Sequence, residues 1–262
     1  LGKGHINDSY KVSSNGKEYV LQRINHHIFK NVEQLQDNIS RVTSHIRAKL
    51  EARGETDIER KVLSLLPARD EKLYYKDGNG DYWRVMDFIG GSKSYDEINP
   101  ELAYRAGMAF GDFQQMLADL PGDPLFETIP NFHNMEARLE TFRASVKNNR
   151  AGRLNEVADL VSEIELRADE MCKAERLHRE GMLPKRTNHC DTKVNNILFD
   201  EEDRVLCVVD LDTVMPGYVL SDFGDFIRTG ANTGAEDDKE LGRVSVDLAI
   251  FEGYAKGYLQ KA

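Results

Sequence analysis

Short runs of β-branched and aromatic residues dominate the first ninety positions of the chain. Residues 9–13 and 18–24 form two such runs, and the turn between them contains Asn15-Gly16. This dipeptide favours tight hairpins because both residues tolerate positive φ. A second pair of runs covers residues 72–75 and 82–89. The pattern therefore predicts a strand-rich N-terminal region built from hairpins.

Apolar residues elsewhere recur every three or four positions, which is the helical period. A helix is predicted over residues 32–50, with Gly54 as its C-terminal cap. Asn99 and Pro100 are typical of the start of a second helix, as N-cap and first helical residue. A third long helix is predicted over residues 153–180. The apolar face of the first helix comprises Val32, Leu35, Ile39, Val42, Ile46 and Leu50.

The pattern changes at the small residues Gly90-Gly91-Ser92. Beyond them the chain is mainly helical, with one short β insertion at residues 187–209 and helices again from residue 221. The predicted fold class is therefore α+β, with a small β-rich N-terminal lobe (residues 1–89), a hinge near residues 88–92 and a larger helical C-terminal lobe (residues 90–262).

Composition and charge limit the possible functions. The 262 residues are 40% hydrophobic and 31% charged, which is typical of a folded protein, and the net charge of −10 argues against a general nucleic-acid surface. There is no apolar run of the ~20 residues needed to cross a bilayer, and residues 1–8 do not resemble a signal peptide. Three cysteines without CxxC spacing argue against disulfides and a thiolate zinc site. We expect a cytoplasmic protein without membrane or nucleic-acid partners.

The most informative motif is His189-x-Asp191 followed, after four residues, by Asn196. In phosphotransferases with this spacing the aspartate accepts a proton from an attacking hydroxyl, and the asparagine binds Mg²⁺. Lys193 is close enough in sequence to offset charge on a transferring phosphate. His189 is predicted to orient the loop rather than to act as a base.

A second acidic motif follows the apolar run at residues 205–209, which ends in Asp210-Leu211-Asp212. A hairpin folded symmetrically about Asp203 would place Asn196 opposite Asp210. Two protein oxygens suffice for Mg²⁺ when phosphates and water complete its coordination. Each motif alone is also ordinary loop chemistry, but their order and the hairpin between them favour phosphoryl transfer.

These motifs resemble those of the aminoglycoside phosphotransferase and choline kinase superfamily, which has the bilobal protein-kinase fold. The chain is most similar to N-acetylhexosamine 1-kinases within it. The resemblance rests on residues 189–196 and 209–217, and on the segments Gly4-His5-Ile6-Asn7-Asp8-Ser9-Tyr10, Tyr19-Val20-Leu21-Gln22-Arg23, Tyr82-Trp83-Arg84-Val85, Ile129-Pro130-Asn131-Phe132-His133-Asn134 and Asp222-Phe223-Gly224-Asp225. Relatives of this type are longer, so we expect parts of both ends to lie outside this sequence.

The resemblance implies an ATP- and Mg²⁺-dependent kinase. Asp191 would be the catalytic base, Asn196 and Asp210 the magnesium ligands, and Asp212 a second acid near the metal. Asp222 would brace the catalytic loop, although a residue at a helix start is equally suited to an N-cap.

The nucleotide side is expected in the N-terminal lobe. Gly2, Gly4 and Asn7 resemble a loop that covers the nucleotide phosphates, although a plain turn is the alternative. Arg23 stands where protein kinases have a lysine, and it would contact ATP or form a surface ion pair. Its helix partner would be Glu33.

The hinge and the acceptor side complete the expected site. Backbone groups near Asp87 and Ile89 would bind the adenine edge. The expected small-molecule sugar acceptor would meet polar residues near the cleft, which could equally bind loop backbone: His133, Asn134, Arg186 and Asn188.

The leading hypothesis is a kinase that phosphorylates the anomeric hydroxyl of an N-acetylhexosamine. The first alternative is a choline- or aminoglycoside-type kinase acting on another small alcohol. An inactive kinase-fold binding module is disfavoured because Asp191, Asn196 and Asp210 are all present. A carboxylate-metal nuclease or phosphatase fits poorly with a glycine-rich first loop and a hinge.

Overall fold

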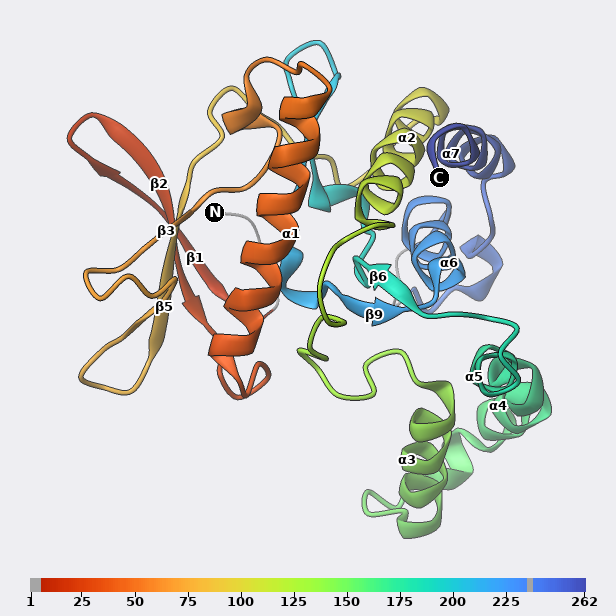
Figure 1. Cartoon of the computed structure of the whole chain (residues 1–262). Helices are drawn as coiled ribbons and strands as arrows, with labels where there is room; N and C mark the ends of the chain where they lie inside the picture. The colour runs from red at the N-terminus through yellow and green to blue at the C-terminus, as the bar shows by residue number, and fades with distance from the viewer. Residues whose placement is uncertain (1–5, 235–237) are drawn as a thin grey trace. The chain divides into compact units, whose positions relative to one another are not determined.

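The structure is a computed structural model that describes residues 6–234 and 238–262. The chain divides into two compact units (Figure 1): the first comprises Leu1–Ile129 with Thr187–Ala262, and the second Pro130–Arg186. The lobe boundary expected at residues 89/90 falls inside the first unit and stays a prediction. No helix in the described ranges is long and apolar enough to cross a membrane.

An antiparallel five-stranded sheet forms the strand-rich N-terminal region, in the order β1-β2-β5-β3 with β4 also paired to β5. Both predicted hairpins are confirmed, and Asn15 and Gly16 adopt the positive φ values their turn requires. Gln22 pairs with Arg84 and Arg23 with Trp83 across β2 and β5. The strands are β1 (Asp8–Ser14), β2 (Lys17–Ile24), β3 (Leu65–Leu66), β4 (Tyr75–Lys76) and β5 (Tyr82–Asp87).

Helix α1 (Val32–Ala52) follows β2 and confirms the first predicted helix. The Asn31 side chain caps its start by accepting from the Gln34 amide, and Gly54 ends it with a positive φ. The apolar face is buried in a core shared with Ile24, Leu211 and Val214. Burial of that stripe, more than intrinsic propensity, keeps a surface helix folded. A short 3₁₀ turn, η1 (Ile58–Arg60), follows.

Helices α2 (Pro100–Leu117) and α7 (Leu248–Lys261) lie side by side in the first unit (Figure 1). Asn99 caps α2 as predicted, accepting from the Leu102 amide. Glycines allow the close approach: a Cβ at Gly107 would lie 2.2 Å from the Tyr254 carbonyl oxygen, and one at Gly257 2.0 Å from that of Tyr104. Helix α6 (Val219–Gly230) contributes Phe226 to the same core.

The second unit corrects one prediction. In place of a single helix over residues 153–180, the chain forms a 3₁₀ turn and two helices, with breaks at Val157 and Cys172. Of its apolar residues at helical spacing, only Ala168 is buried, so no continuous core holds one long helix straight; these residues are Leu154, Val157, Val161, Ile164, Ala168, Met171 and Leu177. The unit comprises α3 (Met135–Asn148), η2 (Leu154–Glu156), α4 (Ala158–Met171) and α5 (Lys173–Arg179).

The β insertion is confirmed as two small two-stranded sheets in which β6 pairs with β9 and β7 with β8. Its strands are β6 (Arg186–Asn188), β7 (Ile197–Phe199), β8 (Val205–Val208) and β9 (Met215–Gly217). The 3₁₀ turns η3 (Val194–Asn196), η4 (Leu211–Thr213) and η5 (Leu241–Arg243) complete the chain. The arrangement is the expected mixed α+β fold.

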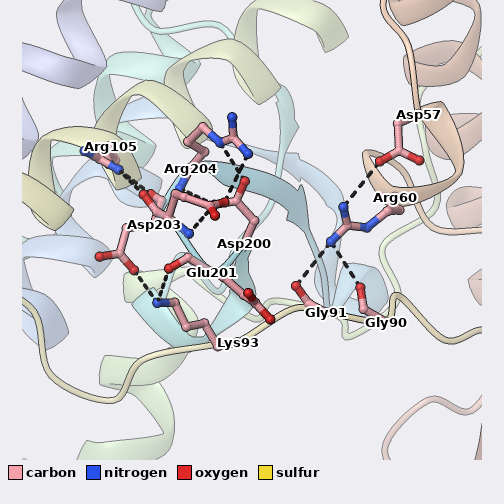
Figure 2. A network of polar contacts seen from close by, with 11 residues as sticks. Asp57, Arg60, Gly90, Gly91, Lys93, Arg105, Asp200, Glu201, Asp203 and Arg204 are labelled. Atoms are coloured by element: carbon pink, nitrogen blue, oxygen red, sulfur yellow. Dashed lines mark hydrogen bonds and ion pairs between the residues drawn. The ribbon is translucent and has the colours of Figure 1, made fainter.

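The linker after β5 is held on two sides. Lys93 exchanges backbone hydrogen bonds with Phe199 of β7, and its ammonium lies 2.7 Å from Asp203 at the hairpin tip. Figure 2 shows this contact together with Arg60, whose guanidinium donates to the carbonyls of Gly90 and Gly91. The linker is thus bound to the β7–β8 hairpin, and Asn196 lies at the opposite end of that hairpin.

Candidate active site

The catalytic-loop motif forms one compact cluster. The Asn196 side-chain amide donates to the backbone oxygen of Asp191 at 2.8 Å and to its carboxylate at 3.2 Å. The Lys193 ammonium lies 3.3 Å from the other carboxylate oxygen. The side chains of Asp191 and Lys193 are 26% and 34% exposed, so a substrate can reach them.

The hairpin register differs by one residue from the prediction. Ile197 pairs with Val208, and the Val209 amide donates to the Asn196 carbonyl, so Asn196 faces Val209 rather than Asp210. The turn is centred on Glu202 rather than Asp203, since the Asp200 amide donates to the Arg204 carbonyl and Phe199 pairs with Val205. A bulge between Leu198 and Phe199 then moves the register back by one residue. Asp210 follows directly and adopts a left-handed backbone conformation, φ 59°.

Asp210 lies in an acidic environment. Loss of surrounding water raises the pKa of its carboxyl, and the charges of Asp212 and Asp191 raise it further, whereas Arg84 and Lys193 lower it. Protein atoms surround the carboxyl group, although the residue as a whole keeps some solvent-exposed surface. Side chains from two separate stretches of sequence therefore act on one another here.

Asp222 braces the catalytic loop from α6. Its carboxylate accepts from the amides of His189 at 2.8 Å and Cys190 at 2.9 Å, and from the side chain of Gln114 at 2.8 Å. The helix begins at Val219, so Asp222 is not its N-cap. Burial raises the pKa of Asp222 to about 6, against the opposing effect of the His189 charge and these hydrogen bonds.

His189 is fully buried against Phe110 and Phe113. Its Nε2 lies 2.9 Å from the Val209 carbonyl, and its Nδ1 accepts from the Asp191 amide at 3.3 Å. The ring thereby joins the catalytic loop to the segment that precedes Asp210. Both ring nitrogens thus contact backbone groups of the protein.

Asp212 has both carboxylate oxygens engaged by protein donors. Arg84 lies 2.5 Å from one oxygen, and the Asn7 side-chain amide donates to the other. Arg84 also donates to the Gln22 side chain at 2.8 Å. Sequence reasoning assigned no role to Arg84 or Gln22; the available signal was a cation at an inward position of a strand, where charge is rarely buried unpaired.

Arg23 lies on the other face of the sheet, since neighbouring residues of a strand point to opposite sides. Its guanidinium donates to Asp8 at 2.9 Å, and the side chain is 45% exposed. Glu33 of α1 is exposed as well, whereas Gln36 is buried. The structure thus does not bring Arg23 and Glu33 to the cluster around Asp191.

The hinge positions have partners within the protein. The Asp87 amide donates to the Ser64 carbonyl at 3.1 Å, its carboxylate pairs with Lys17, and the Ile89 carbonyl accepts from the Ser92 hydroxyl at 2.6 Å. Gly2 and Gly4 lie outside the described residues. Asn7, the described member of that loop, contacts Asp212 as above and accepts from the Asn25 amide.

The expected acceptor residues are divided between the two units. His133, Asn134 and Arg186 belong to the second unit, in which Asn134 caps α3 by accepting from the Ala137 amide. Asn188 is fully buried in the first unit, where its side-chain oxygen accepts from Gln114. Asn188 is therefore closed to an acceptor in this conformation.

The donor set around Asp191 fits a hard divalent cation. Asn196 uses its amide nitrogen on Asp191, which leaves the amide oxygen for a metal, and the carboxylate of Asp210 offers a second oxygen donor. Among residues 6–234 and 238–262, no group of three or more His, Cys, Asp or Glu side chains could hold a metal alone. Mg²⁺ does not need such a group, because nucleotide phosphates and water fill its remaining positions.

A separate cavity of about 650 Å³ lies between α1, α2 and the β7–β8 hairpin. It has an apolar floor that includes Val208 and Leu211, the near neighbours of Asp210. The candidate residues Asp191, Lys193, Asn196 and Asp210 do not line it. This cavity is therefore distinct from the catalytic loop.

Solved structures share this fold. Spectinomycin phosphotransferase in complex with ADP and spectinomycin superposes with a TM-score of 0.56 at 14% identity, covering 98% of this chain and 72% of that one. A microcompartment-associated aminopropanol kinase gives 0.54 at 17%, covering 100% and 74%. Ethanolamine kinase from Plasmodium vivax gives 0.54 at 10%, covering 97% and 68%. The fold is thus that of protein-kinase-like small-molecule phosphotransferases.

The sequence itself matches a family over almost its whole length. Residues 1–258 match the family described as phosphotransferase enzyme family, APH. The match includes the catalytic loop, the acidic motif after β8 and the strands of the N-terminal sheet. The chain therefore belongs to the APH phosphotransferase family.

Proposed function

We propose that the protein transfers the γ-phosphoryl group of ATP to a sugar hydroxyl with the help of Mg²⁺. The observation that carries the proposal is the convergence of Asp191, Lys193, Asn196 and Asp210 at the end of one hairpin. Family membership supports the reaction class, and the contacts among these side chains support the roles proposed for them below.

Asp191 would accept the proton of the attacking hydroxyl while the oxygen forms a bond to the γ-phosphorus. The bond between that phosphorus and the β–γ bridging oxygen breaks, and ADP leaves with the electron pair. Lys193, held 3.3 Å from Asp191, would offset charge on the transferring group. Asn196 and Asp210 would hold Mg²⁺, which when bound neutralises phosphate charge. His189 and Asp222 keep the loop in position.

The nucleotide would be covered by the loop that contains Gly2, Gly4 and Asn7, with adenine at the backbone near Asp87 and Ile89. Arg23 remains a predicted ATP contact, although in this structure it pairs with Asp8. These assignments follow from the resemblance of the segments to nucleotide-binding kinases.

The proposed acceptor is the anomeric hydroxyl of an N-acetylhexosamine, which would yield the sugar 1-phosphate. Resemblance to N-acetylhexosamine 1-kinases over segments spread along the chain supports this choice. His133, Asn134 and Arg186 are the proposed acceptor contacts. Other small alcohols, such as choline or an aminoglycoside, are the alternative within the same fold.

A panel of acceptors in a coupled ADP-release assay tests the proposal. N-acetylglucosamine, N-acetylgalactosamine, choline and kanamycin would be compared at equal concentration, with ³¹P NMR locating the phosphate on the product. We expect turnover with an N-acetylhexosamine and phosphate on its anomeric oxygen. Turnover with choline or kanamycin alone would replace the acceptor but keep the reaction class, and ATP binding without ADP release would favour an inactive module.

A further inference from the structure

The ion pair between Arg84 and Asp212 is almost completely withdrawn from water. The two side chains are 3% and 4% exposed, and their nearest atoms lie 2.5 Å apart. Arg84 also donates to Gln22, and Asn7 donates to Asp212. The other ion pairs around the sheet, such as Lys11–Glu18 and Arg23–Asp8, are far more exposed.

A buried pair of this kind is a poor device for stability. Removing two charges from water costs free energy that their attraction often fails to recover, so apolar residues of similar volume can hold the same space equally well. The pair does fix geometry, because the fork of an arginine directs its hydrogen bonds to defined positions. The elements that carry Arg84 and Asp212 indicate which part of the structure this ion pair holds in place.

Arg84 lies in β5, which pairs with β2, β3 and β4 and leads to the linker. Asp212 lies in η4, two residues after Asp210. The same turn is fixed by Thr128, whose hydroxyl donates to the Asp212 carbonyl, and by Thr213, whose hydroxyl donates to the His189 carbonyl. The Arg84–Asp212 pair is thus the side-chain link from the centre of the sheet to the segment that carries Asp210.

We propose that Arg84 and Asp212 are positioning residues that set the place of the Asp210 carboxylate, and that Asp212 is not itself a metal ligand. The inference rests on the proposed function, in which Asp210 is a ligand of the divalent cation. It departs from the sequence expectation that Asp212 joins the metal site. Asp212 has no carboxylate oxygen left without a protein donor.

Asp212 could act as a positioning residue or as a metal ligand, and the direction in which one substitution changes the Mn²⁺ affinity distinguishes these two roles. Arg84→Met releases Asp212 from its main partner. If Asp212 positions Asp210, Mn²⁺ with ADP should bind at least tenfold more weakly to this variant. If Asp212 is a ligand held back by Arg84, Mn²⁺ should bind more tightly, which would overturn the proposal. Electron paramagnetic resonance of free Mn²⁺ measures the binding without any acceptor or turnover.

The double variant Arg84→Met with Asp212→Leu separates positioning from stability. Each single variant leaves one buried charge unpaired and should lower the melting temperature by roughly 10 °C, whereas the double variant should melt within a few degrees of the wild type. We expect the double variant to retain at least tenfold weaker Mn²⁺–ADP binding and a kcat at least 100-fold lower, with KM for the acceptor little changed. Recovery of binding and kcat together with stability would overturn the proposal.

Two controls complete the test. The exposed pair Lys11–Glu18, replaced by methionine and leucine in the same way, should leave melting, Mn²⁺–ADP binding and kcat unchanged. If the double variant does not fold, Arg84→Lys decides, since it keeps the charge but loses the fork that reaches both Gln22 and Asp212. Unchanged Mn²⁺–ADP binding in Arg84→Lys would overturn the proposal. A wild type that binds Mn²⁺–ADP but transfers no phosphate would refute the proposed function alone.

Discussion

At the scale of single residues, the buried carboxylate of Asp222 has a cost that depends on pH. Its pKa is raised to about 6 in the folded protein, above the ordinary value of 3.8, so folding favours its protonated form. The stability that protonation contributes is fully present below about pH 4 and is lost as the pH rises through about 6. At neutral pH the ionised group is retained because it accepts the loop amides of His189 and Cys190.

Asp222→Asn should therefore change how stability varies with pH. The variant lacks the titrating group, so the difference in free energy of unfolding between variant and wild type should shift in favour of the variant between about pH 4 and pH 7, by about 3 kcal/mol in total. Urea unfolding at several pH values measures it. A difference that stays constant across this range would contradict the raised pKa.

Residues of the candidate site differ in how far their contacts can be predicted from the sequence. The motif that contains Asp191, Lys193 and Asn196 is local, so its members meet whatever the rest of the chain does. The predicted partner of Asn196 across the hairpin was wrong by one position, because the turn is centred on Glu202 and a bulge follows it, and the symmetric fold assumed from the sequence includes neither. Arg84 could not be matched to Asp212 because 128 positions separate them and only the packed fold joins them.

At the scale of elements, the crossing of α2 and α7 depends on glycines. Gly107 and Gly111 on one helix, and Gly253 and Gly257 on the other, have backbone atoms of the opposite helix where a Cβ would stand. A side chain there would force the helices apart, since backbone cannot move aside as a flexible side chain can. The predicted period identified α2, but the need for small residues appears only once its partner helix is known.

Gly257→Ala should destabilise the protein by about 3 kcal/mol, because its Cβ would lie 2.0 Å from the Tyr104 carbonyl oxygen. Gly224→Ala in α6 is the matched control, since no atom lies within 4 Å of its added Cβ. Alanine there should be neutral or stabilising by up to ~1 kcal/mol through helix propensity. Chemical unfolding of both variants measures the contrast, and equal effects would contradict the packing described.

The linker gives a prediction of small effect. Lys93 pairs with Asp203 at the surface (Figure 2), yet its backbone is bonded to Phe199 on both sides. Exposed pairs contribute at most ~1 kcal/mol, so Lys93→Ala should change the free energy of unfolding by less than that and leave kcat unchanged. Chemical unfolding measures the stability, and the ADP-release assay measures kcat. A large loss of stability or of kcat would show that the Lys93 side chain, rather than its backbone, holds the linker in place.

The single helix predicted over residues 153–180 shows where helical periodicity misleads. Apolar residues at helical spacing do not specify a continuous helix when few of them are buried, and of the seven from Leu154 to Leu177 only Ala168 is. Helix α3 carries Met135, Leu139, Phe142 and Val146 at helical spacing, yet Leu139 is its one buried residue, and this helix is not among those predicted from the sequence. In the first unit, by contrast, burial and periodicity agree, and the predicted elements are found there.

At the scale of the whole molecule, fold and chemistry are defined more sharply than the acceptor. The solved structures with this fold include phosphotransferases for spectinomycin, aminopropanol and ethanolamine, so one scaffold accommodates unlike alcohols. In this chain, the motif with Asp191, Lys193 and Asn196 is proposed for the transfer step and not for choice of acceptor. The sequence therefore indicates the reaction class before it indicates the substrate.

The proposed role of Asp191 is to accept the proton of an alcohol during phosphoryl transfer. Its most direct test is the rate of ADP release by Asp191→Asn with the best acceptor of the panel, with ADP affinity measured by calorimetry. Asp159→Asn, an exposed change in the first turn of α4, is the control. We predict a kcat about 10²–10⁴-fold below wild type with ADP affinity nearly unchanged, and full activity in the control. A near-normal kcat in Asp191→Asn would contradict the claim.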